Sequence, residues 1–114
     1  MFTGVPNLIS VFGYFRASWT LRVDLIGDFF CRLIGFMSEH GFAVVAPALR
    51  EEDQDMRLGP WIDPADFNPG YLNRSIHLLP KQGSRDPWRN GLNYLTEKAA
   101  LPVAPLDDGT LVFG

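Results

Sequence analysis

Ser18 and Thr20 stand where a long helical pattern begins, and the start of a helix can bind an electron-rich group. They flank Trp19, directly before the apolar repeat of the helix. Either hydroxyl can cap the helix, because it can accept a hydrogen bond from a backbone N–H group of the first turn. Those N–H groups also carry a partial positive charge that attracts a group such as a phosphate. An ordinary capped corner without a ligand is the alternative, and the residues alone leave both open.

Three other polar segments contain residue types that occur in sites. Four carboxylates lie between Arg50 and Arg57 without a clustered histidine, so we interpret this segment as a solvated loop. His77 has no second ligand at metal-binding spacing and is interpreted as a surface residue. The basic run 81–85 could meet a cofactor phosphate, although such runs usually face water. It contains neither a Walker nor a dinucleotide glycine pattern.

A strand and a helix are expected to position the helix start. The apolar run Leu8–Phe12 predicts a strand buried on both faces, and 13–17 turns the chain. Apolar side chains then repeat every fourth residue, which is typical of a helix packed on a core. These side chains are Leu21, Leu25, Phe29, Leu33 and Met37. Gly41 is placed to end the helix in the left-handed conformation.

The rest of the chain predicts shorter elements. A second strand, Phe42–Ala46, could join the first strand and the helix in a βαβ unit. A second helix is expected from Asn68 to Leu79, and a third from Asp86 onward, with Trp88, Leu92, Leu95 and Ala99 on one face. The prolines of 101–106 predict an extended edge segment, and 110–113 a closing strand.

Composition limits the classes of partner. The chain has 114 residues, enough for one domain at most, and a net charge of −3. This mild acidity argues against binding to nucleic acid or to a membrane surface. The single Cys31 excludes an internal disulfide and is interpreted as a buried, inert thiol. Charged residues interrupt the most apolar stretch, 25–37, so we expect no membrane span and a cytoplasmic location.

Short segments in three separated parts of the chain carry a resemblance to a known family. They are Gly4–Leu8, Phe12–Tyr14 and Ala17–Leu21, then Leu79–Arg85 with Pro87–Arg89, then Asp107–Leu111. In this order they resemble the C-terminal portion of flavin-containing monooxygenases of the Baeyer–Villiger-like, ethionamide-activating type. The resemblance covers essentially the whole chain.

The resemblance implies an FAD- and NADPH-dependent oxygenase. In that family, reduced flavin captures O₂ and the peroxyflavin oxygenates a ketone, thiocarbonyl or sulfide. The helix start lies near the flavin ring, which implies cofactor-binding roles for Ser18, Trp19 and Thr20. Relatives often carry a threonine–asparagine pair where this chain has Phe15 and Arg16. Arg16 would therefore offer a charged contact in place of a polar one.

The implied fold is an α/β fragment in two parts. Residues 1–47 would be the C-terminal part of an FAD-binding domain, with a strand, a long helix and a short strand. Residues 48–114 would be a tail with two short helices and a terminal strand or hairpin. The first strand has no partner before it, so the sequence reads as the middle of a domain.

The family's two G-x-G-x-x-G fingerprints, for FAD and NADPH, do not occur in this sequence. Without that phosphate-binding turn, we expect no tight FAD binding by this chain alone. The sequence therefore predicts a C-terminal fragment that is not catalytic by itself. It would need a missing N-terminal portion or a separate N-terminal chain. It would self-associate through the uncovered apolar surface of Leu21, Leu25, Phe29, Leu33 and the strand 8–12. The alternative is a non-catalytic interaction module, a remnant without cofactor.

Overall fold

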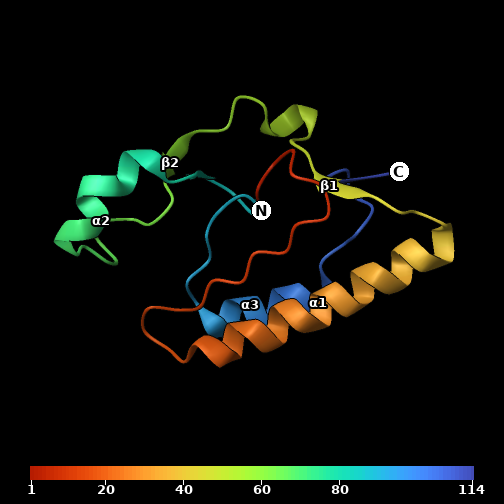
Figure 1. Cartoon of the computed structure of the whole chain (residues 1–114), viewed down its shortest axis with the longest axis horizontal. Helices are drawn as coiled ribbons and strands as arrows, with labels where there is room; N and C mark the ends of the chain where they lie inside the picture. Colours follow the sequence, from red (N-terminus) through yellow and green to blue (C-terminus); the bar gives the residue numbers. More distant parts are fainter. The chain divides into compact units, whose positions relative to one another are not determined.

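The long helix that the apolar repeat predicts is the largest element of the chain. In the computed structural model, which describes all 114 residues, α1 spans Trp19–His40 (Figure 1). Leu25, Leu33 and Met37 of the predicted stripe are buried. Gly41 ends the helix with φ at +71°, and its N–H group donates to the Ser38 carbonyl at 3.4 Å. The predicted helix and its glycine end are confirmed.

The chain divides into two compact units. The first, here the α1 unit, contains residues 3–48 and 91–114, and the second, the β2–β3 unit, contains 1–2 and 49–90. The predicted boundary between residues 47 and 48 concerned a parent FAD-binding domain, and it stays a prediction. Within this chain, the last 24 residues return to the unit that contains α1.

The α1 unit has its core between α1 and a two-stranded sheet. Strand β1 (Val45–Pro47) pairs antiparallel with β4 (Leu111–Phe113), with Ala46 opposite Val112. Figure 1 shows α3 (Tyr94–Ala100) beside α1, and a 3₁₀ turn at 101–103 follows it. The buried core residues are Leu33, Met37, Val45 and Leu111, with Phe29, Phe42, Leu106 and Phe113 packed around them.

The prediction of a buried strand over 8–12 is wrong. This segment has no regular secondary structure and no place in a sheet, and Leu8, Ile9 and Val11 are all more than 40% exposed. Residues 4–7, just before this segment, occupy the edge of β1 instead, since the N–H groups of Gly4 and Asn7 donate to carbonyls of β1 at 2.8 Å. With no strand at 8–12 the βαβ unit is also wrong, and the second predicted strand pairs antiparallel with β4.

The β2–β3 unit contains the second antiparallel pair of strands. Strand β2 (Leu58–Pro60) pairs antiparallel with β3 (Lys81–Gly83). Between them lies α2 (Gly70–Ser75), followed by a 3₁₀ turn at 76–78. The predicted second helix is therefore present, in a shorter form than 68–79. Leu72 on its inner face is buried.

The third helix begins later than its sequence signals indicate. Asp86–Pro87 lies in a turn, and α3 begins at Tyr94 after Asn93, whose side chain accepts from the Thr96 N–H at 3.0 Å. The cap and proline pattern at 86–87 is overridden because Trp88 is buried in another contact, described below. The segment after α3 turns as a 3₁₀ helix where extended chain was predicted. The closing strand is confirmed as β4.

The fold is thus a small α/β arrangement with three α-helices and short antiparallel strands. No helix has both the length and the apolar composition of a membrane-spanning segment.

Candidate functional site: the start of helix α1

The hydroxyls at the start of α1 bond to each other. Ser18 stands at the predicted N-cap position with extended backbone angles, φ −61° and ψ 135°. Its Oγ lies 2.8 Å from Oγ1 of Thr20, and no side chain accepts a hydrogen bond from the backbone of the first turn. The first turn also contains no acidic residue. The expected hydroxyl cap is therefore absent. The Leu21 N–H donates to the Ser18 carbonyl at 3.3 Å, and the N–H groups of Trp19 and Thr20 are left for an outside acceptor.

Trp19 and Arg16 complete the set of residues predicted for this site. Trp19 is 51% exposed, and one edge of its ring packs on the backbone of Gly13. A Cβ at Gly13 would lie only 2.3 Å from that ring, so a glycine is required there. Arg16 is exposed and forms no ion pair. The structure thus places Arg16, Ser18, Trp19 and Thr20 together on one exposed end of α1.

A buried ion pair holds the loop before the helix in place. Arg22, in the second turn of α1, pairs with Glu97 of α3 through Nη2 and Oε1 at 2.7 Å. Its Nη1 donates to the Phe12 carbonyl at 3.1 Å, and its guanidinium lies 5.3 Å from the centre of the Tyr14 ring. One side chain therefore connects the loop to both helices.

Tyr14 is the most deeply buried large side chain of the α1 unit, with 1% of its surface exposed. Its hydroxyl donates a hydrogen bond to Glu97. Burial and the Glu97 carboxylate raise the pKa of Tyr14 above its ordinary value, so the phenol stays protonated and remains a donor. At Gly91 an added Cβ would lie 2.6 Å from Oε1 of Glu97, so a side chain there would displace the carboxylate that pairs with Arg22.

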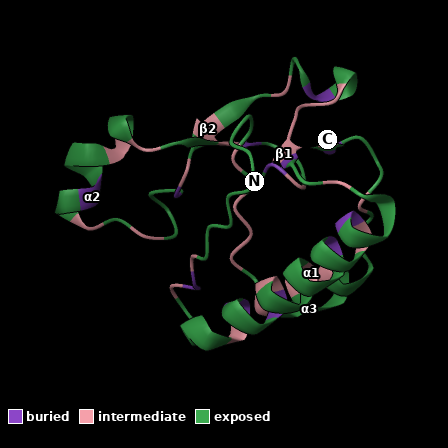
Figure 2. Ribbon diagram, turned by 45° about the vertical axis from the view of Figure 1, so that its right-hand side comes forward, coloured by how far each residue is buried: buried purple, intermediate pink, exposed green.

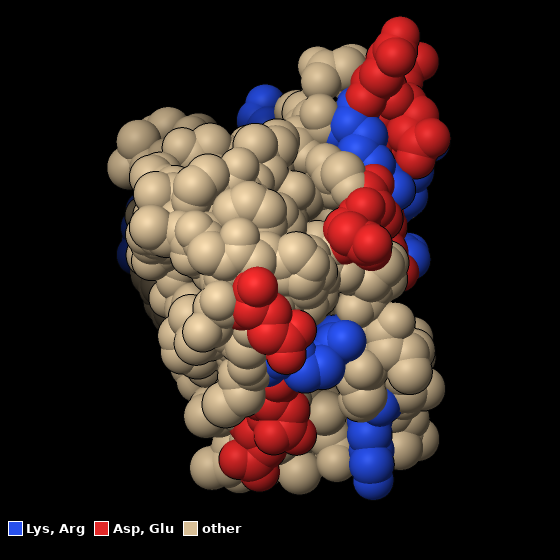
Figure 3. Space-filling view, turned by 90° about the vertical axis from the view of Figure 1, so that its right-hand side faces the viewer, with Lys and Arg blue, Asp and Glu red and all other residues tan.

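A second apolar stripe runs along the exposed side of α1. Trp19, Val23, Phe30 and Ile34 are between 38% and 51% exposed, and half-buried Ile26 continues their spacing. Steps of three and four residues place them on one helix face. Figure 2 shows that much of α1 is exposed. Figure 3 shows one face of the molecule, where acidic and basic side chains lie close together beside an uncharged area.

The exposed side of α1 also contains the cysteine. The interpretation of Cys31 as buried is wrong, since its side chain is exposed. The stripe that was expected to lack cover is buried at Leu25 and Leu33, so the candidate interaction surface of α1 is instead its exposed apolar stripe.

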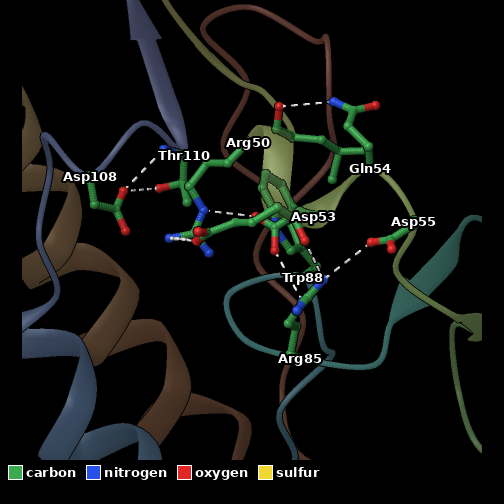
Figure 4. A network of polar contacts seen from close by, with 10 residues as sticks. Arg50, Asp53, Gln54, Asp55, Arg85, Trp88, Asp108 and Thr110 are labelled. Atoms are coloured by element: carbon green, nitrogen blue, oxygen red, sulfur yellow. Dashed lines mark hydrogen bonds and ion pairs between the residues drawn. The ribbon is translucent and has the colours of Figure 1, made fainter.

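The acidic segment of the β2–β3 unit contains a residue that sequence analysis placed wrongly. Glu51, Glu52 and Asp55 are exposed as expected, but Asp53 is only 1% exposed. Figure 4 shows the groups around it: Nε of Arg50 at 2.8 Å and Nε1 of Trp88 at 2.9 Å both donate to its Oδ2.

These donors act on the charge of Asp53. Arg85 adds a guanidinium 3.2 Å from Oδ1, although this contact is not aligned as a hydrogen bond. The hydrogen bonds from Arg50 and Trp88 lower the pKa of Asp53 below its ordinary value. The ionised carboxylate therefore connects two segments of its unit, residues 50–53 and residues 85–88. No three His, Cys, Asp or Glu side chains lie close enough together to hold a metal ion.

Comparison with known proteins decides the family. Over 99% of its length the chain is 41% identical to the FAD-containing monooxygenase EthA of Mycobacterium tuberculosis and to EthA of Mycolicibacterium smegmatis. It is 39% identical, again over 99% of the chain, to the probable FAD-binding monooxygenase AlmA of Acinetobacter baylyi. The chain is related to the C-terminal part of the FAD-containing monooxygenases. No family model and no solved structure matches it.

The resemblance that the sequence blocks carry is therefore confirmed. The chain spans 22% of the length of these relatives. FAD is supported for the family by the names of the relatives, whereas NADPH and the roles of Arg16, Ser18, Trp19 and Thr20 remain proposals.

Sequence reasoning missed the residues that support the start of α1. The sequence pattern places Tyr14 in the turn at 13–17 and gives Glu97 no role. One signal was available: Arg22 stands three residues before Leu25, on the same helix face as the buried stripe. A cation on a buried face requires a partner, which here is Glu97.

Proposed function

We propose that the chain forms the C-terminal part of an FAD- and NADPH-dependent monooxygenase acting on ketones, sulfides or thiocarbonyls. The observation that carries this proposal is the 41% identity, over 99% of the chain, to proteins named as FAD-containing monooxygenases. The α1 unit would be the end of the FAD-binding domain, and the helix start would form one wall of the flavin site. When bound, the reduced FAD would be the group that reacts with O₂.

The open helix start supports a role beside the flavin ring. Backbone N–H groups with no side-chain cap can donate to the electron-rich pyrimidine end of the ring, and the helix dipole favours negative charge there. No carboxylate of the first turn competes for these donors. Exposed Arg16 would add a positive charge, while Trp19 would offer an aromatic surface. The Tyr14–Arg22–Glu97 contacts would keep this end of α1 in position.

The phosphate groups of the cofactor would have to be held by another portion of the enzyme. The chain has no dinucleotide-binding glycine pattern. In this proposal the portion that supplies the pattern also covers the apolar stripe of α1 formed by Trp19, Val23, Phe30 and Ile34. The same stripe favours the alternative, an interaction module without cofactor, because it would serve partner binding equally well.

A chimera separates the two functions. This chain would replace the matching C-terminal segment of M. tuberculosis EthA, with EthA lacking the segment as control. We expect the chimera to retain FAD and to oxidise NADPH with oxygenation of a sulfide, and the truncated control to lose both. A chimera that folds and contains the chain stably, but neither retains FAD nor oxygenates the sulfide, would favour the interaction module.

A further inference from the structure

The β2–β3 unit contains a hollow of about 300 Å³ that the monooxygenase assignment does not use. Arg57 and Arg89 line it, together with Ser84, Asp63 and the backbone of the paired strands β2 and β3. Its volume is at the lower end of the range for small-molecule sites.

Gln82 lines this hollow, and hydrogen bonds fix its side chain. Its Nε2 donates to the Pro60 carbonyl at 2.8 Å, and its Oε1 accepts from the Asn90 N–H at 2.8 Å. Gly83 beside it has no room for a side chain, since an added Cβ would lie 2.3 Å from Met56. The strand pairing and these contacts hold Gln82 and Gly83 in place, so this part of the lining cannot easily move to fill the hollow.

The cations on its wall are available to a ligand. Arg57 forms no ion pair, and Arg89 has only a loose contact of 3.4 Å with Asp86, both side chains of that pair being more than half exposed. An ion pair this exposed contributes little to stability, so a ligand can displace it at small cost. Guanidinium groups match the oxygens of phosphate in planar, paired hydrogen bonds, and the Ser84 hydroxyl can add a further donor.

We propose that this hollow binds a phosphate monoester, with Arg57, Arg89 and Ser84 on the phosphate. The volume exceeds the space that a single phosphate ion fills, so an organic part is accommodated as well. Asp63 on the wall suits a hydroxylated organic part, because its carboxylate can accept from a hydroxyl. Its Oδ1 already accepts from the Ala65 N–H, which leaves the second oxygen for the ligand. The proposal concerns residues 57–89 alone and does not depend on flavin binding.

Protection from arginine modification tests the site in the unchanged chain. The chain is treated with phenylglyoxal at constant ionic strength, alone, with inorganic phosphate or with ribose 5-phosphate, and each arginine is followed by mass spectrometry. We expect both additions to slow the modification of Arg57 and Arg89, with ribose 5-phosphate effective at the lower concentration. Arg74 is an exposed arginine outside the hollow and serves as the internal control. Uniform protection, or none, would overturn the proposal.

Equilibrium dialysis with variants gives a second readout. Arg57→Gln and Arg89→Gln should each weaken the binding of ribose 5-phosphate about tenfold, because each removes a charge-assisted contact. Arg74→Gln should leave binding unchanged. Binding of inorganic phosphate without binding of the ester would refute the ester as ligand, and equal affinity of all variants would refute the site.

Discussion

At the scale of single residues, the start of α1 differs from an ordinary capped helix. Ser18 and Thr20 have the residue types of caps, yet their hydroxyls bond to each other at 2.8 Å. A helix end that does not use its available capping groups leaves its N–H donors for another acceptor. Because the cap is unused, changing Thr20 should affect the flavin reaction and the stability of the helix differently, so experiments can distinguish a flavin-facing role from a structural one.

Thr20→Asp in the EthA chimera should slow flavin reoxidation about a hundredfold, because a carboxylate would compete for donors that stabilise charge on the reduced flavin. Melting temperature should stay equal or rise slightly, since an acid in the first turn interacts favourably with the helix dipole. Thr20→Val is the matched control, as it removes only the contact with Ser18. If Thr20→Asp reoxidises at the normal rate, the helix start does not face the flavin.

The pair Arg22–Glu97 should be costly to break from one side. Each side chain is less than one-fifth exposed, so Arg22→Met leaves a buried carboxylate and should lower the unfolding free energy by about 3 kcal/mol. The double variant with Glu97→Gln should lose clearly less than the sum of the two single changes. Urea unfolding of the four proteins measures this coupling, and simple additivity would show that the pair does not act as a unit.

Asp53 should make the β2–β3 unit sensitive to acid. Its pKa is lowered in the folded protein, so its stabilisation is complete above the unfolded pKa of about 3.9 and is lost as the pH falls through the lower folded value. Urea midpoints measured from neutral pH down to about pH 2 should fall steeply at the acid end for the unchanged chain. Asp53→Asn should be less stable at neutral pH and show a weaker acid dependence. Asp55→Asn, at a side chain that is 94% exposed, should leave the curve unchanged.

At the scale of elements, α1 has two apolar faces with different tasks. Leu33 is 8% exposed and packs in the core, whereas its neighbour Ile34 is 47% exposed. The sequence predicted the inner face correctly, because its four-residue spacing is the ordinary signal of a packed helix. It also showed apolar residues on the other face, but spacing alone does not tell which of two faces is covered.

Leu33→Ala and Ile34→Asp form a matched pair that separates these faces. Leu33→Ala should lower the unfolding free energy by about 2–5 kcal/mol through the cavity that it creates. Ile34→Asp should change stability by no more than about 0.5 kcal/mol and reduce self-association of the isolated chain. Thermal unfolding and sedimentation measure the two effects. An unchanged chain that sediments as a single monomer would show that the outer face does not drive association.

The strands were less predictable than the helix. Leu8–Phe12 has the composition of a buried strand, yet strand formation depends on neighbours that no local pattern specifies. Residues 4–7 occupy the edge of β1, so residues 8–11 lie outside any sheet and are exposed. Likewise, the helix signal at Asp86–Pro87 was outweighed by the burial of Trp88 against Asp53, a contact 35 residues away in sequence.

At the scale of the whole molecule, the chain has some features of a folded domain and others of a segment of a larger protein. It has a core around Leu33 and Val45, a supported helix start and a buried carboxylate cluster. It also exposes an apolar helix face and spans 22% of the length of its monooxygenase relatives. Sequence resemblance identified the family, because separated blocks in a fixed order are specific. The supporting residues Tyr14 and Glu97 required the structure, because they lie 83 positions apart.

The central claim is that this chain completes a flavin site without holding the flavin by itself. The most direct test is the amount of FAD bound per protein molecule, measured for the isolated chain and for the EthA chimera after identical loading and removal of free FAD. The account predicts a colourless isolated chain, because a helix start contributes about 1–2 kcal/mol toward an anion and cannot replace a phosphate-binding turn. It predicts one FAD per molecule of the chimera. Stoichiometric FAD on the isolated chain, or a folded chimera without FAD, would contradict it.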